Sequence, residues 1–316
     1  MLRWIALVLM FTLAARAQEA ARPGLVTERE VMTQLQNFLD QQLFGPGKID
    51  GLGGEFTTKA LWCYQRAHAL PATGRLDENI PLDSVFPVYT EYTIRPEDMK
   101  FVGDLPAENA AKEKLKFLPY DCILEFLTER FHCDPTLIAK LNPAHNLDTL
   151  QPGDIVRVPN VEPFEIEKLP KQGSVPSKPE YKHRKIKISR KHRLLELTDG
   201  DALIASVPIT PGSDKTPTPP GEWKIAGIAA QPTFRWDEGV LNYGVRTESS
   251  WLLPPGPNNP VGVLWCQLNK PGIGIHGTNS PQTIGRSASH GCMRVANWDI
   301  VRLMHMITAG MQVTIE

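Results

Sequence analysis

The sequence has almost no net charge, few cysteines and only a short apolar run at its N-terminus. Its 316 residues carry 34 Lys and Arg against 35 Asp and Glu, a formal net charge of −1 at pH 7. Near-neutrality argues against a nucleic-acid-binding protein, which needs excess positive charge. The apolar run at residues 4–13 is too short to span a bilayer comfortably. The length and the 41% hydrophobic content instead fit a globular chain of two or three domains.

The N-terminus has the pattern of a secretory signal. Arg3 supplies the positive end, the apolar run follows, and Ala15-Arg16-Ala17 fits a small-x-small cleavage site. We expect residues 1–17 to be a signal peptide and the mature protein to be exported. A retained anchor is the alternative. No cysteine follows the cleavage site, which disfavours a lipoprotein.

The few cysteines form an odd set of five: Cys63, Cys122, Cys133, Cys266 and Cys292. An odd count in an exported protein leaves at least one thiol free or shared between molecules, and Cys292 is the natural candidate. Cys122 and Cys133 flank a predicted helix, which would part their Cα atoms by about 16 Å. A disulfide spans at most about 7 Å, so we leave these two unpaired. Pairing between domains stays open.

The candidate catalytic residues lie in residues 273–294. This segment is rich in Gly, Ser, Thr and Asn, and it carries His276, His290 and Cys292. A thiol attacks best as thiolate, and a nearby imidazole favours that form. His290 precedes Cys292 by two residues, so in an extended chain the two side chains share a face. His276 can approach only through folding. Backbone N–H groups of the turn at residues 289–292 could stabilise an oxyanion.

Two simpler interpretations of these residues remain. A lone cysteine is often a small buried hydrophobic residue. A Cys/His set can instead bind zinc, but this segment offers only three ligands and lacks the usual zinc-finger spacing.

The segment resembles the catalytic domain of L,D-transpeptidases of the YkuD type. That family is marked by an upstream HGT, here His276-Gly277-Thr278, and a downstream SHGC followed by an apolar residue and Arg. The stretches KTPTPPG at 215–221 and PPGPNNP at 254–260 resemble two further family segments in the right order. The resemblance covers roughly residues 181–316.

The resemblance implies a mainly-β sandwich and assigns roles to particular residues. It implies Cys292 as the nucleophile, His276 as the general base, and the Gly277 carbonyl as the group that orients the imidazole. The amides of His290, Gly291 and Cys292 would form the oxyanion hole. No metal and no organic cofactor is implied. We expect the residues that contact substrate to be Ser289, Arg294, Arg286, Trp236 and Tyr243, although the aromatic residues of 232–251 could equally serve only to pack the domain.

Two smaller modules are predicted before this domain. Residues 27–86 read as a small all-α module, opening with the capping-box pattern Thr27-Glu28-Arg29-Glu30. They resemble the helical peptidoglycan-binding module through the LQ, FGPGKIDG, TTKAL, YQ and TG pieces. Residues 87–115 read as a linker or covering segment, with a solvated charge run at 107–114.

Residues 116–160 predict strand, helix, helix, strand, a small α+β unit that resembles LysM. We expect a strand at 116–119, helices capped by Asp121 and Asp134, and a last strand at 155–159. The DCIL start departs from the LysM pattern, so the unit either binds glycan or is a degenerate spacer. Residues 161–180 hold four prolines with Lys, Gly and Ser, a semi-rigid linker composition.

The catalytic domain is then predicted at residues 181–316. Its expected elements include an exposed basic strand face within 182–193, a hairpin turning at Asp199-Gly200, a closing helix near 298–307 and a last strand at 312–315.

These resemblances imply an exported, wall-associated enzyme of the periplasm or cell envelope. Its partner would be peptidoglycan, and it would take a stem-peptide acyl group onto Cys292 as a thioester. The acceptor would be another stem peptide, an outer-membrane lipoprotein or a free D-amino acid. Water as acceptor would make it a carboxypeptidase, and a decayed, non-catalytic wall-binding protein is the rival from another class.

Overall fold

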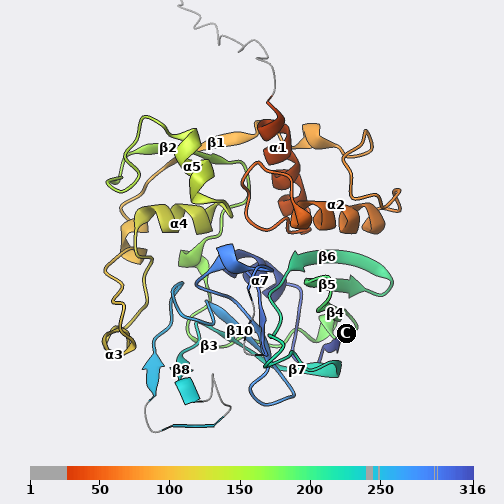
Figure 1. Cartoon of the computed structure of the whole chain (residues 1–316), viewed down its shortest axis with the longest axis vertical. Helices are drawn as coiled ribbons and strands as arrows, with labels where there is room; N and C mark the ends of the chain where they lie inside the picture. Colours follow the sequence, from red (N-terminus) through yellow and green to blue (C-terminus); the bar gives the residue numbers. More distant parts are fainter. Residues whose placement is uncertain (1–26, 240–244, 248–249, 288, 290) are drawn as a thin grey trace, which may run out of the picture.

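The computed structural model describes residues 27–239, 245–247, 250–287, 289 and 291–316. Two small modules lie side by side along one end of a larger β domain, and helix α7 of that domain faces them (Figure 1). The predicted signal peptide, Tyr243 and His290 lie outside the described residues. Within the described part, none of the helices combines the length and the apolar content that a bilayer crossing requires.

The N-terminal module consists of α1 (Glu28–Gln41), α2 (Glu55–Ala67) and a short 3-10 helix, η1 (Leu82–Ser84). The predicted cap is confirmed, because the Thr27 hydroxyl accepts from the Glu30 amide at 3.2 Å. Phe38 and Tyr64 pack edge to face, with ring centroids 4.9 Å apart, in the core between α1 and α2. This packing of two amphipathic helices confirms the predicted all-α module.

The middle module pairs β1 (Tyr89–Thr93) with β2 (Ile155–Pro159) antiparallel, and α4 (Ile123–Arg130) and α5 (Pro135–Leu141) lie between them in sequence. Two predictions here are wrong. Residues 116–119 are not a strand, because Leu118 donates its amide to Pro255 of the catalytic domain at 2.8 Å. Asp121 does not cap α4, whose N-cap is Cys122.

The second predicted cap of the middle module is correct, since the Asp134 carboxylate accepts from the Thr136 amide at 2.8 Å. The supposed linker before the helices supplies β1 itself. It also supplies η2 (Asp98–Phe101) and α3 (Asn109–Lys112).

The predicted linker at residues 161–180 packs on the protein rather than extending into solvent. Val161, Phe164 and Ile166 are buried in the core of the middle module. Further along, β3 (Gly173–Ser174) pairs with β7 (Gly221–Ala230). The short helices η3 (Ile166–Lys168) and η4 (Pro179–Tyr181) complete this segment. The proline-rich segment at residues 161–180 therefore packs against the middle module and the catalytic domain.

The catalytic domain is a curled β-sheet, which confirms its predicted mainly-β class. The described strands of its main sheet run in the order β12-β11-β10-β7-β13-β4-β5-β6, with β3 beside β7. A separate ribbon pairs β8 with β9. The remaining bounds are β4 (Lys185–Ser189), β5 (Leu194–Asp199), β6 (Ala202–Pro208), β8 (Phe234–Trp236), β9 (Trp251–Leu253), β10 (Leu264–Leu268), β11 (Gly274–His276), η5 (Pro281–Thr283), β12 (Met293–Arg294), α7 (Asn297–Met304) and β13 (Gln312–Ile315).

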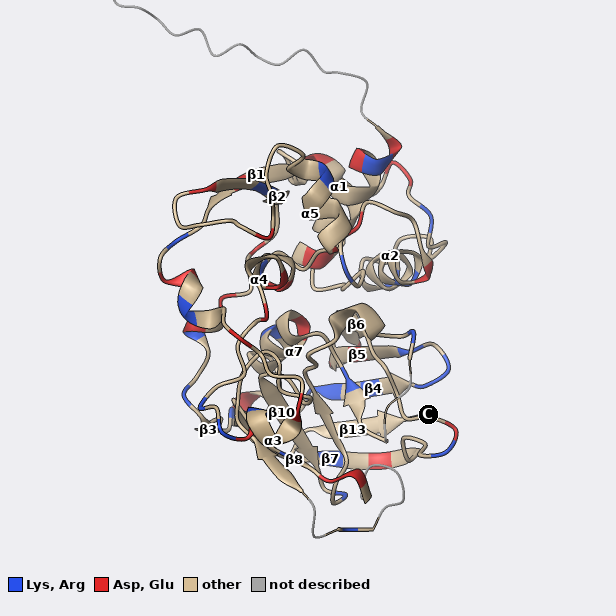
Figure 2. Cartoon of the chain, turned by 60° about the vertical axis from the view of Figure 1, so that its left-hand side comes forward, with Lys and Arg blue, Asp and Glu red and all other residues tan. Residues whose placement is uncertain are grey.

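Local predictions in this sheet are confirmed where they rest on period-two patterns or turn residues. Ile186 and Ile188 of β4 are buried, while Lys185 and Lys187, which alternate with them, are exposed; the basic residues colour this strand in Figure 2. The hairpin turns at Asp199-Gly200, with Gly200 at φ +59°, where glycine meets no Cβ penalty.

A buried charge cluster joins all three modules. Asp40 of α1 accepts from both terminal nitrogens of Arg302 in α7 and from His132 of the middle module. Although burial opposes it, the Arg302 and His132 charges hold the pKa of Asp40 well below its usual range. His132 also stacks on Trp298, with ring centroids 5.2 Å apart. These contacts fix the modules against one another.

Candidate active site

His276 lies at the end of β11, between two strands. It faces Trp265 of β10 across an antiparallel pair and Arg294 of β12 across a parallel pair. Its imidazole stacks on Trp265, with ring centroids 5.2 Å apart and an interplanar angle of 22°. Nδ1 donates to the Gly277 carbonyl at 2.6 Å. Because a carbonyl only accepts, Nδ1 carries the proton and Nε2 keeps its lone pair.

The environment keeps this imidazole neutral. Burial lowers the pKa of His276 to about 4, the Arg294 charge adds to the effect, and the bond to the Gly277 carbonyl opposes it. A neutral imidazole with a free Nε2 can accept a proton at neutral pH.

Cys292 lies directly before β12. It is two residues before Arg294, whose register partner is His276. The thiol donates to the Gly272 carbonyl at 3.3 Å. Burial raises the pKa of Cys292 to about 11, against opposing effects of the Gly274 backbone and the Arg294 charge. Burial therefore opposes the thiolate form that a nearby imidazole would favour.

The turn before Cys292 is anchored from two sides. The Ser289 hydroxyl donates to the Cys292 carbonyl at 2.5 Å. The backbone of Ser289 bonds to Pro211 and Ser213 at 3.0 and 2.9 Å. Gly291 has φ +106°, a conformation that disfavours any residue with a side chain. The turn thus holds Cys292 at a defined place before β12.

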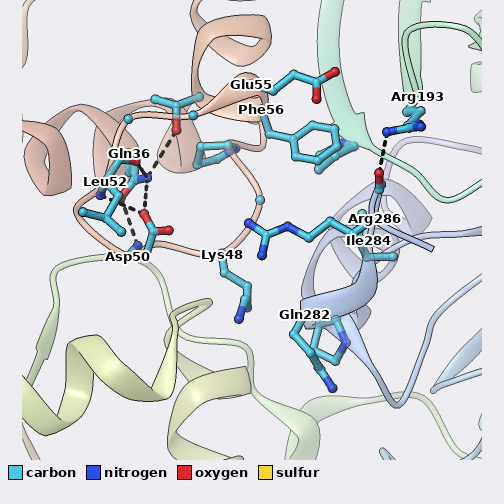
Figure 3. A pocket seen from close by; sticks show the side chains of 18 residues that line it. Gln36, Lys48, Asp50, Leu52, Glu55, Phe56, Arg193, Gln282, Ile284 and Arg286 are labelled. Atoms are coloured by element: carbon cyan, nitrogen blue, oxygen red, sulfur yellow. Dashed lines mark hydrogen bonds between the residues drawn. The ribbon is translucent and has the colours of Figure 1, made fainter.

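The predicted substrate residues separate into different places. Arg294 is beside His276 and Cys292, and its Nη2 donates to the Ser287 hydroxyl at 3.0 Å. Trp236 lies on the separate β8–β9 ribbon, opposite Trp251. Arg286 instead points into a cavity between the N-terminal module and the catalytic domain (Figure 3).

That cavity has a volume of about 380 Å³ and is lined by α1, the start of α2 and the loop at residues 281–286. The loop belongs to the connection between β11 and β12. Phe56 at the start of α2 presses on Gly285, where an added Cβ would overlap the ring. Arg193 donates to the Gly285 carbonyl at 2.7 Å. The cavity is therefore made jointly by the two modules.

Three residues around the site, the buried Asn297 and Glu129 and the half-buried Trp265, were not singled out from the sequence. Trp265 stacks on His276, Asn297 bonds the loop after His276, and Glu129 bonds Asn297. A tryptophan and an asparagine inside apolar runs carry no sequence signal of a site, because packing residues look the same.

All five cysteines fall within the described residues and are free thiols. In this part of the chain no three His, Cys, Asp or Glu side chains are grouped as a metal site.

Comparisons with known proteins match two of these modules, the catalytic domain and the N-terminal module, as separate families. Residues 183–315 match the family described as "L,D-transpeptidase catalytic domain", and residues 28–80 match "Putative peptidoglycan binding domain". The "Putative L,D-transpeptidase YkuD" of Bacillus licheniformis is 27% identical over 61% of this chain and 92% of its own length. The "Probable L,D-transpeptidase YbiS" of Escherichia coli K12 is 32% identical over 49% of this chain and 52% of its own length.

Among solved structures, an L,D-transpeptidase from Mycobacterium smegmatis covers 53% of this chain and 76% of its own, with 14% identity and a TM-score of 0.35. The LysM resemblance of the middle module has no counterpart in these matches. Residues 183–315 thus match the family of L,D-transpeptidase catalytic domains, and the residues 28–80 that precede them match the family of peptidoglycan-binding domains.

Proposed function

We propose that the protein is a cysteine-dependent L,D-transpeptidase that acts on peptidoglycan stem peptides. The proposal rests on the β11–β12 pair, in which Arg294 is the register partner of His276 and Cys292 directly precedes β12. It rests also on the Nδ1 bond to Gly277, which leaves Nε2 of the imidazole as the proton acceptor. The match to an enzyme family that carries this name supports it.

In the proposed reaction the Cys292 sulfur attacks the carbonyl of the L-centre residue in the donor stem. His276 Nε2 takes the thiol proton during the attack and returns it to the leaving amine. The terminal D-amino acid departs and a thioester remains. An acceptor amine then attacks the thioester, the C–S bond breaks, and the amine proton passes through His276 to the sulfur. Each half-reaction therefore begins and ends with neutral groups.

The remaining assignments follow from position. We propose that the amides of His290, Gly291 and Cys292 stabilise the oxyanion. Ser289 shapes their turn, and Arg294 faces the developing charge. Trp236, on the β8–β9 ribbon, would border the peptide groove, and we propose Tyr243 as a further residue that contacts the peptide. Arg286 would contact wall material in the cavity beside the peptidoglycan-binding domain rather than the reacting carbonyl.

The proposed setting is the cell envelope. The signal pattern of residues 1–17 motivates export with cleavage after Ala17. An intact mass of the envelope-extracted protein that still includes these residues would contradict it.

Mass analysis of muropeptides after incubation with the mature protein tests the activity and names the acceptor. Cross-linked dimers, a muropeptide–lipoprotein adduct, exchanged terminal residues and plain tripeptides correspond to stem, lipoprotein, D-amino acid and water acceptors. Unchanged muropeptides, or identical products from Cys292→Ala, would favour a decayed wall-binding protein.

A further inference from the structure

Asn297 fixes the peptide group that orients His276. Its side-chain oxygen accepts from the amides of Val263 and Thr278, both at 3.2 Å. The Thr278 N–H and the Gly277 carbonyl belong to the same planar peptide group, and that carbonyl receives the His276 Nδ1 proton. An added Cβ at either Gly277 or Gly262 would overlap the Asn297 oxygen, so the loop packs directly on this amide.

The other end of Asn297 is held by a different module. Its Nδ2 donates to Glu129 Oε1 at 2.8 Å, although the two residues are 168 positions apart. Glu129 lies on α4 of the middle module, is 5% exposed, and takes a second hydrogen bond from the Tyr120 hydroxyl. With donors converging on its oxygen and an acceptor at its nitrogen, the Asn297 amide has one satisfied orientation.

A continuous chain of contacts thus runs from the middle module to the catalytic imidazole. We propose that Glu129 is a positioning residue for His276, acting through Asn297 and the Gly277–Thr278 peptide. The inference rests on the proposed role of His276 as the general base. It gives the middle module a part in the chemistry of the catalytic domain, apart from any binding of glycan.

The best conservative variant is Glu129→Gln. Burial raises the pKa of Glu129 to about 8, which favours the uncharged carboxyl, and glutamine has a similar shape without a charge. The glutamine oxygen can accept from Asn297 while its nitrogen donates to the Tyr120 hydroxyl. Glu129→Leu keeps a similar volume and removes both interactions.

The primary measurement is kcat and KM on a soluble muramyl tetrapeptide. Glu129→Leu should lower kcat about 10- to 100-fold with little change in KM, the size expected when a catalytic group moves by about 1 Å. Glu129→Gln should stay within about threefold of the native rate. In a His276→Ala background, Glu129→Leu should add nothing, because residues that act through one group are not additive.

Glu125→Leu is the matched control. Glu125 lies one turn earlier on α4 and accepts from Asn258 of the catalytic domain at 3.2 Å, a contact that does not lead to His276. It should cost stability without the specific loss of kcat. Equal kcat losses in the two leucine variants, or a Glu129→Leu loss that persists fully in His276→Ala, would overturn the proposal.

A compensating pair covers the case in which Glu129→Leu does not fold. Asn297→Asp keeps the acceptor for Val263 and Thr278 but loses the donor to Glu129, so kcat should fall. Adding Glu129→Gln supplies a donor to the new carboxylate and should recover kcat at least severalfold. Absence of recovery contradicts the inference, whereas full activity of His276→Ala would instead contradict the proposed general base.

Discussion

At the residue scale, burial raises the pKa of the Cys292 thiol and lowers the pKa of the His276 imidazole, and both shifts favour the neutral forms. Cys292 and His276 were both recognisable from the sequence, because each lies in a short contiguous motif. Their protonation was not, because it depends on burial and on Arg294, which only folding brings beside both. Asn297 escaped prediction for the same reason, since its contacts come from three distant parts of the chain.

The thiol chemistry predicts an unusual pH profile for Cys292 alkylation. With its pKa raised to about 11, the thiolate fraction should grow throughout the range from pH 6 to 10 without a plateau. His276, with its pKa lowered to about 4, should add no inflection in that range. Peptide mapping after brief iodoacetamide treatment at each pH measures the rate.

The three buried thiols, Cys63, Cys133 and Cys266, should lag behind Cys292 at every pH because they are almost fully covered. Cys292→Ser is the labelling control. A plateau between pH 6 and 8 would indicate a thiolate–imidazolium pair and contradict the neutral resting state.

At the element scale, the β11–β12 connection serves two sites. Its ends carry His276 and Cys292, while its middle, residues 281–286, lines the cavity beside α1 and α2 (Figure 3). Strands with clear alternation were predictable, as in β4. β1 was assigned to a linker, because its partner β2 comes much later in the chain. The apolar residues at 116–119 have the pattern of a strand, but the Leu118 amide bonds to Pro255 of another module, and the sequence does not reveal such a tertiary contact.

Arg286→Gln should weaken turnover of intact sacculi severalfold while leaving the rate on a soluble tetrapeptide unchanged. Its guanidinium points into the cavity made with the peptidoglycan-binding domain, where anionic wall groups would meet it (Figure 3). Parallel assays on both substrates measure the split. The matched control is Arg75→Gln. Arg75 is an exposed arginine of the peptidoglycan-binding domain and lies outside the cavity lining. Equal losses on both substrates would place Arg286 at the reaction centre instead.

At the scale of the whole molecule, the modules behave as one packed body. Val263, Ala296 and Trp298 of the catalytic domain belong to the same buried cluster as the helices of the middle module. The proline-rich composition of residues 161–180 predicts a semi-rigid linker, but composition does not reveal that Val161, Phe164 and Ile166 are buried there. A chain beginning near Tyr181 would lack the middle module and expose Val263, Ala296 and Trp298, so we expect it to lose activity on soluble and polymeric substrates alike.

Asp40→Ala should destabilise the whole protein by about 3–5 kcal/mol, because it leaves the buried Arg302 charge without its main partner. Denaturant unfolding followed by fluorescence should give one transition shifted to lower denaturant. Glu91→Ala, on the exposed face of β1, serves as the control with little effect. Two separate transitions, with only one shifted, would show that the modules fold independently.

The central claim is that Cys292 carries the stem-peptide acyl group. Intact-protein mass spectrometry during turnover of a soluble tetrapeptide substrate, without an acceptor amine, tests it most directly. We expect an adduct equal in mass to the donor acyl group, mapped to Cys292, together with one equivalent of released D-amino acid. Cys292→Ala should show neither. Release of the D-amino acid by Cys292→Ala, or an adduct mapped to another residue, would contradict the account.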